Sequence, residues 1–203
     1  MKAWKITGVL LIAAIAAVVV YVWHEARRGF SARQEPSAIE TILAKTARNM
    51  ALPSEYQKLR NPFPMSPENL RAGMEHFADH CAICHANDGS GDTLFGKNLY
   101  PKPPDMRTAE TQHKPDGELY YTIQNGVRLT GMPAFGENHS IADADTWKLV
   151  LFIRHLPQLT NDQLKEMEAL NPKTDEERRE ESEEQNFLQG KNPQSISKEF
   201  HHH

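Results

Sequence analysis

The apolar positions along this chain of 203 residues change their spacing several times, and the first spacing predicts a membrane segment. Ile6 to Trp23 is an uncharged, mostly apolar run of 18 residues, just long enough to cross a bilayer core as a helix. Trp4 and Trp23 bracket the run, as aromatic side chains do at membrane interfaces. The alternative is a cleaved signal peptide with its cleavage site near residues 14–16, but the apolar run continues beyond them. We therefore predict a transmembrane signal-anchor over residues 1–24.

A second stretch carries apolar residues at the spacing of an amphipathic helix. Residues 66–80 place Leu70, Met74 and Phe77 on one stripe. Ser66, followed directly by a proline, is a typical helix start. This predicted helix leads straight into the two cysteines of the chain.

Two further stretches predict helices on either side of that segment. Residues 143–157 are apolar at most positions, and Asp143 or Asp145 can cap their start. Residues 35–53 have a shorter amphipathic pattern. We expect them to form a short helix within a linker over residues 25–60.

The formal net charge of −4 comes from one segment. Residues 173–184 contain seven acids and three bases, which leaves 20 bases and 20 acids in the rest of the chain. The sequence therefore offers no basic stripe for phosphates, and a nucleic-acid partner is not expected. The block lies in a charged C-terminal extension over residues 159–203. There we predict one more helix over 158–170, followed by a solvated helix or a disordered segment.

Cys81 and Cys84 stand three positions apart, and a histidine follows the second. A disulfide is one interpretation, but thioredoxin-like redox proteins carry such a pair after a strand, whereas a helix is predicted here. A zinc site would want two more soft ligands at a similar spacing, and the chain has no further cysteine. Cys-x-x-Cys-His is instead the pattern of covalent haem c attachment.

The spacing suits that chemistry. Thiols at i and i+3 on a helical turn reach the two vinyl groups on one edge of a porphyrin, and His85 then points its imidazole at the iron. Met132, in a Gly- and Pro-rich loop, is the candidate sixth ligand, because a thioether favours the reduced iron and raises the potential. His139 is the nearest alternative. We predict one haem c, bound through Cys81 and Cys84, with His85 and Met132 as its axial metal ligands.

Together, these motifs resemble a monohaem class I c-type cytochrome. In chain order they are a first helix, CAICH, DGSGD, YPKPPDM, the helical pattern DGELYYTIQNGV, GMPAF and a last helix. The resemblance implies an all-α cytochrome c fold over residues 61–158, with a haem crevice among three to five helices. It also implies that the first and last helices cross near the haem, with Phe77 and Trp147 as partners.

The resemblance implies four further cofactor-binding residues: Pro104, Arg128, Tyr121 and Trp147. A carbonyl of the proline-rich loop, which we assign to Pro104 rather than Pro103, accepts the ring N–H of the proximal histidine in this family. Arg128 is the best candidate for a haem propionate, because its charge would neutralise a carboxylate.

These features predict electron transfer rather than enzymatic bond chemistry. Haem of this kind is attached outside the cytoplasm, so we expect a single-pass protein of the inner membrane with its haem domain on the periplasmic side. The arginines after the apolar run argue for the opposite orientation. The expected partners are redox proteins of the membrane or a larger respiratory or dehydrogenase complex, with no small-molecule substrate.

Two other functions remain as alternatives. A haem-based enzyme or gas sensor would have an open or weakly capped iron, which the GMPAF loop disfavours. A thiol oxidoreductase without haem would use the two cysteines directly.

Overall fold

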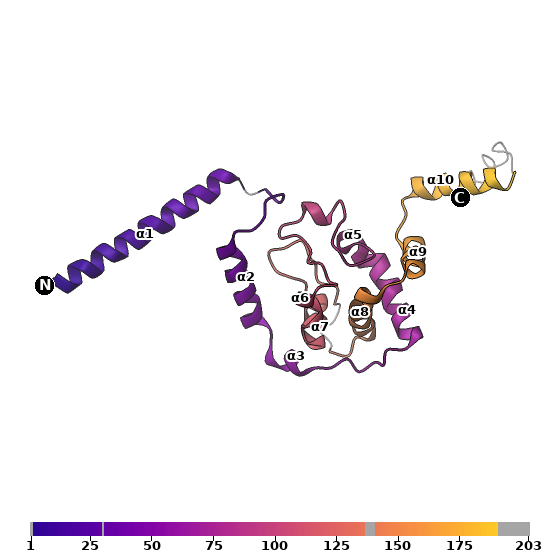
Figure 1. Cartoon of the computed structure of the whole chain (residues 1–203), viewed down its shortest axis with the longest axis horizontal. Helices are drawn as coiled ribbons and strands as arrows, with labels where there is room; N and C mark the ends of the chain where they lie inside the picture. The colour runs from indigo at the N-terminus through magenta and orange to yellow at the C-terminus, as the bar shows by residue number, and fades with distance from the viewer. Residues whose placement is uncertain (1, 30, 137–140, 191–203) are drawn as a thin grey trace.

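The computed structural model describes residues 2–29, 31–136 and 141–190. Over these ranges the chain is all-helical, as predicted. Its elements are α1 (Lys2–Arg28), α2 (Ala38–Ala51), α3 (Ser54–Lys58), α4 (Pro67–His76), η1 (Phe77–Cys81), α5 (Ala82–His85), η2 (Gly96–Asn98), α6 (Ala109–Gln112), α7 (Asp116–Asn125), α8 (Ala144–His155), η3 (Leu156–Gln158), α9 (Asn161–Leu170) and α10 (Asp175–Leu188). Figure 1 shows a packed body around α4, α7 and α8, from which α1 and α10 project. His139 and the end of the C-terminal extension lie outside the described residues.

The helix α1 coincides with the predicted membrane segment. Within Trp4–Arg27, an 18-residue window has a mean hydropathy of 2.6, and none of that window is buried inside the protein. A helix of this length and composition can cross a membrane, although a signal sequence has the same properties. The body provides no cover for these apolar side chains.

The centre of the body is the crossing of α4 and α8, where Gly73 lets the two backbones come close. A Cβ atom at Gly73 would meet the carbonyl oxygen of Lys148, and it would lie 2.8 Å from the carbonyl carbon and 3.0 Å from Cβ of Phe152. Both helices begin at the predicted caps. The Ser66 hydroxyl accepts from the backbone N–H of Asn69, and the Asp143 carboxylate accepts from the first turn of α8.

The aromatic pairs across this crossing differ from the predicted ones. Phe77 packs against Phe152, with ring centroids 5.1 Å apart. Trp147 instead stacks on Tyr120 of α7, at 4.2 Å. The reason is the position of the crossing: Phe77 lies one turn beyond Gly73, so it meets the side chain one turn beyond Lys148.

The packed body takes in residues on both sides of the predicted 61–158 segment. Before it, the ring of Tyr56 in α3 lies edge-on to Tyr121 of α7, at 4.9 Å, and the α3 backbone packs directly on Gly117. After it, Met167 of α9 is completely buried in the main core. The helix α9 therefore belongs to the body rather than to a solvated tail.

The charge block of the C-terminal extension forms a helix, one of the two predicted outcomes. Thr174 and Glu177 make a capping box at the start of α10. None of the α10 residues is buried, so charge and capping, rather than packing, support this helix.

Candidate functional site

One continuous helical segment delivers the three residues of the Cys-x-x-Cys-His motif. It runs from α4 through η1, a π-helical turn, into α5, which ends at His85. Cys81 closes the π turn and Cys84 lies in the last turn. Single π turns inside helices are frequent at functional sites. The helix stops abruptly, because Ala86 adopts φ 61° and ψ 157°, a conformation that non-glycine residues rarely hold.

Both thiols are free, and the pKa of each is raised rather than lowered. Burial, with a smaller effect of the neighbouring Cys84, raises the pKa of Cys81 to about 12. Burial also raises the pKa of Cys84. Reactive redox cysteines need a lowered pKa that exposes a thiolate, so this pair does not resemble a thiol oxidoreductase centre. Among the described residues, no group of three or more His, Cys, Asp or Glu side chains is arranged to hold a metal ion.

The histidine of the motif has the properties of a metal ligand. Burial lowers the pKa of His85 to about 4, so its imidazole is neutral at physiological pH. Neutral imidazole is the form that binds metal ions. Its Nδ1 atom is buried and has no hydrogen-bond partner among the described residues. A buried ring nitrogen without a hydrogen-bond partner is unfavourable in a folded protein. The imidazole and the two adjacent thiols fit a covalently attached haem.

The predicted hydrogen bond from the His85 ring to the Pro104 carbonyl is not present among the described residues. The Nδ1 atom of His85 has no hydrogen-bond partner there, and Pro104 is exposed. The neighbouring Pro103 comes closer to the motif. Its carbonyl oxygen lies 3.0 Å from the Cβ position of Gly91, whose N–H donates to the carbonyl of His85 at 2.8 Å. A haem contact of Pro104 therefore stays a prediction.

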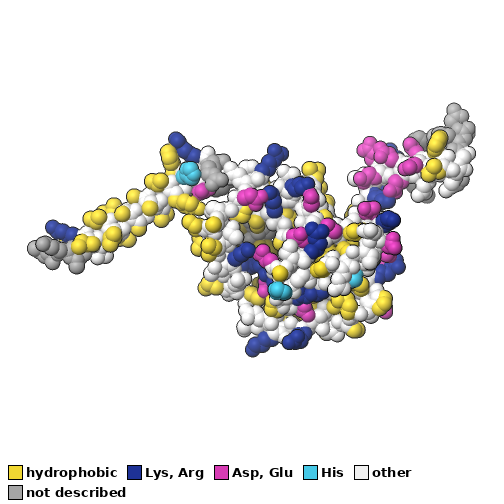
Figure 2. Space-filling view, viewed as in Figure 1, with side chains coloured by type: hydrophobic (Ala, Val, Ile, Leu, Met, Phe, Trp, Pro, Cys, Tyr) yellow, Lys and Arg dark blue, Asp and Glu magenta, His cyan; other side chains and the backbone are white. Residues whose placement is uncertain are grey.

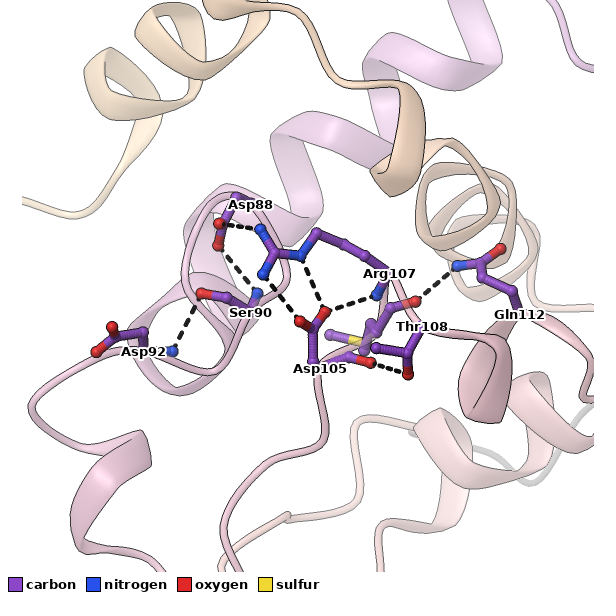
Figure 3. A network of polar contacts seen from close by, with 8 residues as sticks. Asp88, Ser90, Asp92, Asp105, Arg107, Thr108 and Gln112 are labelled. Carbon is purple, nitrogen blue, oxygen red and sulfur yellow. Dashed lines mark hydrogen bonds and ion pairs between the residues drawn. The ribbon is translucent and has the colours of Figure 1, made fainter.

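An arginine clamp, which the sequence did not reveal, holds the loop after the motif. Figure 3 shows the Arg107 guanidinium between two carboxylates. Nη1 donates to Asp88 at 2.6 Å, while Nε and Nη2 donate to Asp105 at 2.9 and 2.8 Å. Alongside, the N–H of Met106 donates to the carbonyl of Gly89 at 2.9 Å. The clamp therefore joins the loop after His85 to the end of the proline-rich loop.

Replacing Arg107 by glutamine is expected to lower the free energy of unfolding by about 1 kcal/mol at neutral pH, the upper end for such exposed ion pairs. The hydrogen bond from Arg107 holds the pKa of Asp105 below its usual range. The pair therefore contributes stability above the ordinary aspartate pKa and loses it as the pH falls through the lowered value.

Urea unfolding of wild type and R107Q at neutral pH and at about pH 3 measures this loss of stability. The carboxylates begin to protonate at about pH 3. The difference in free energy of unfolding between wild type and R107Q should be smaller at the acidic pH. Arg71→Gln is the control, since Arg71 pairs with Glu75 on a more exposed helix face. A difference that stays constant with pH would show that the clamp acts through packing alone.

The loop that carries Met132 is closely tied to the end of α7. The N–H of Val127 donates to the carbonyl of Met132 at 3.1 Å, and the N–H of Met132 donates to the Thr130 hydroxyl at 3.1 Å. Further along, the N–H of Phe135 donates to the carbonyl of Ile123 at 3.1 Å. The methionine therefore sits in a loop of defined shape.

Two contacts place this loop against other parts of the site. The ring of Phe135 lies edge-on to His80 of η1, with centroids 6.4 Å apart. The Leu99 side chain, after η2, packs against Gly131, with a side-chain carbon 2.5 Å from the Cβ position of that glycine. The Met132 loop thus reaches both the π turn before the motif and the loop after it.

The other predicted haem contacts occupy different environments. Trp147 is buried in the core, 2% exposed, and its indole N–H donates to the carbonyl of Ile141 at 3.0 Å. Tyr121 is half-buried beside Tyr56. Arg128 is exposed at the start of the Met132 loop. These positions do not test a contact with haem, so the three assignments stay predictions.

Apolar side chains close to the motif are exposed, and the sequence analysis did not single them out. Ile83, between the two cysteines, is 56% exposed, and Phe95 is 57% exposed. Leu94 is more exposed still. The available signal was the apolar pair Leu94–Phe95 in an otherwise polar loop. Exposed apolar side chains beside two thiols and a neutral imidazole suit a site that holds a large apolar group.

Comparison with known proteins agrees with this site. Residues 68–153 match the family described as cytochrome C oxidase, cbb3-type, subunit III. A search of curated proteins finds no match. The matched segment begins in the first turn of α4 and ends in α8, so it contains the Cys-x-x-Cys-His motif, the arginine clamp and the Met132 loop. Residues 68–153 of this chain therefore form a c-type cytochrome domain, a haem-binding module of electron transfer.

Proposed function

We propose that the protein is a membrane-anchored electron carrier with a single haem c. The haem is attached through Cys81 and Cys84 and ligated by His85 and Met132. The helix α1 anchors the chain in the inner membrane and the cytochrome domain faces the periplasm. Its partners are redox proteins of the membrane or the other subunits of a respiratory or dehydrogenase complex.

The observation that carries the proposal is the state of His85. It is buried, neutral and without a hydrogen-bond partner for Nδ1 among the described residues, and it directly follows two free thiols within the matched domain. Neutral nitrogen and thioether sulfur are suitable axial ligands for an iron that changes oxidation state.

When bound, the haem supplies the one-electron couple of its iron. The two thiols hold it covalently, which suits a small body with a limited core. His85 offers its lone pair without first losing a proton, because burial keeps the imidazole neutral. The hydrogen bonds around Met132 hold its backbone in one place, which supports a ligand that needs little reorganisation when the charge of the iron changes.

Electron exchange by this protein needs no charged docking surface. Outside residues 173–184 the chain has as many acids as bases, so long-range electrostatic attraction is weak. Tethering to the same membrane raises the effective concentration of donor and acceptor instead.

The test is the optical spectrum of the haem-loaded full chain, oxidised and reduced, for wild type and Met132→Ala. We expect one haem per chain and a low-spin iron in wild type, with the sulfur-to-iron charge-transfer band. The variant should lose that band and have a lower reduction potential. Met65→Ala is the matched control, because Met65 is an exposed methionine outside the Met132 loop, and its spectrum should not change.

Two outcomes would contradict the proposal. A wild-type iron that is high-spin and binds carbon monoxide readily would favour the gas sensor or enzyme. A protein that matures without any haem would return the two cysteines to thiol chemistry.

A further inference from the structure

The helix α2 contacts the cytochrome body through its polar side. Lys45 pairs with Glu110 at 2.6 Å, and Arg48 approaches Glu118 at 3.6 Å. Lys45 and Arg48 lie three residues apart, so they share one face of the helix. Glu35, just before α2, pairs with Lys102 of the proline-rich loop. The polar face of α2 is therefore turned toward the body.

The opposite face of α2 is apolar and has no cover. None of the α2 residues is buried. The large apolar side chains follow each other at helical spacing and are 58–82% exposed: Ile39, Ile42, Leu43 and Met50. Figure 2 shows hydrophobic side chains along α1 and again on the edge of the body where α2 lies. An exposed apolar stripe of this kind marks an interaction surface.

The start of α2 lies beside the end of the apolar helix α1. The Tyr21 hydroxyl is 3.3 Å from the hydroxyl of Ser37, the residue that caps α2. In the turns that follow Tyr21 in α1, the Arg27 guanidinium stacks over the ring of Trp23 at 3.9 Å. Tyrosine, tryptophan and arginine together are typical of the level where a membrane helix leaves the bilayer. Ser37 therefore lies at the depth of the headgroups if α1 spans the membrane.

We propose that α2 lies in the membrane interface, with its apolar face in lipid and its polar face carrying the cytochrome body. The occupant of the apolar face is the lipid surface, because that face continues from a helix which itself needs lipid. An amphipathic helix held at the headgroup level binds through such a stripe. The inference rests on the proposed anchoring by α1. It adds that the body has a set orientation to the membrane instead of moving freely on a linker.

Photo-crosslinking of the haem-loaded full chain tests this inference. A photoreactive phenylalanine analogue replaces one residue at a time, and the protein is placed in nanodiscs of phosphatidylethanolamine and phosphatidylglycerol. Leu43 probes the apolar face of α2. Ala44 is the matched control, since one step along a helix turns a side chain by about 100°. Val19 of α1 reports on the anchor itself.

We expect lipid adducts at Val19 and at Leu43 in similar yield, and several times less at Ala44. Lipid capture at Val19 without capture at Leu43 would overturn the inference and leave the anchor intact. Adducts of Leu43 with protein would also overturn it, in favour of a second copy or a partner. Lipid capture at none of the three positions would overturn the anchor and the inference together. Equal capture at Leu43 and Ala44 would contradict the proposed orientation of α2.

Discussion

Replacing Gly73 by valine is expected to prevent stable folding of the cytochrome body, and Gly73→Ala to lower its free energy of unfolding by about 2 kcal/mol. A Cβ atom at this position runs into backbone atoms of Lys148 and lies 3.0 Å from Cβ of Phe152. Backbone atoms in the middle of a helix cannot move aside singly, so α4 and α8 would have to separate as whole helices.

Two opposing effects decide the sign of the alanine substitution. Alanine in a helix interior is favoured over glycine by about 1 kcal/mol. Against this, separating α4 from α8 loosens the contact between Phe77 and Phe152, both completely buried or nearly so. Overpacking of a well-packed core costs about 1–3 kcal/mol even where side chains can adjust. The loss therefore exceeds the gain in helix propensity.

Urea unfolding of the haem-loaded chain in detergent, followed by far-ultraviolet circular dichroism, measures the effect. Gly8→Ala is the matched control, because Gly8 also lies in a helix but its Cβ position has no heavy atom within 4 Å. The control should unfold at the same urea concentration as wild type. An unchanged midpoint for Gly73→Ala would contradict the close crossing of α4 and α8.

Helix existence and helix starts could be predicted from the sequence, because both depend on local patterns. Ser66 and Asp143, which were predicted as caps, accept backbone hydrogen bonds at the starts of α4 and α8, and Ser37 caps α2 in the same way. The three residues of the attachment motif could be placed at the end of a helix for the same reason. Each of these predictions involves residues within one or two turns of each other.

The remaining features depend on residues far apart in the chain. Nothing near Gly73 in the sequence indicates that Lys148 will lie against it, and Arg107 meets Asp88 across 19 positions. The ring partner of Phe77 was predicted wrongly because it depends on where two helices cross. The burial of Met167 was missed because α9 lies beyond the segment that resembles a cytochrome, and only the folded body brings it to the core.

Replacing Gly126 by alanine is expected to displace Met132 from its place while leaving the covalent haem attached. Gly126 ends α7 with φ 64° and ψ −167°, a conformation that is almost restricted to glycine and costs another residue about 1–3 kcal/mol. Its Cβ position also lies 2.5 Å from the carbonyl carbon of Pro133 and 2.7 Å from the carbonyl oxygen of Met132. The added methyl group therefore pushes on the backbone of the proposed ligand itself.

The spectrum and the potential of the full chain report this displacement, on the proposed assignment of Met132. G126A should lose the sulfur-to-iron band, and its potential should fall by about 0.1 V or more, within the range of about 0.8 V that axial ligands set. Leu129→Gly is the control in the same loop. Leu129 has φ 63° and is 92% exposed, so glycine relieves strain there and should keep the band.

Loss of the band in both variants would mean that the loop tolerates no change. The loop cannot accept a methyl group at that distance without moving. Retention of the band in G126A would therefore mean that the contact between Gly126 and the Met132 backbone does not position the sulfur.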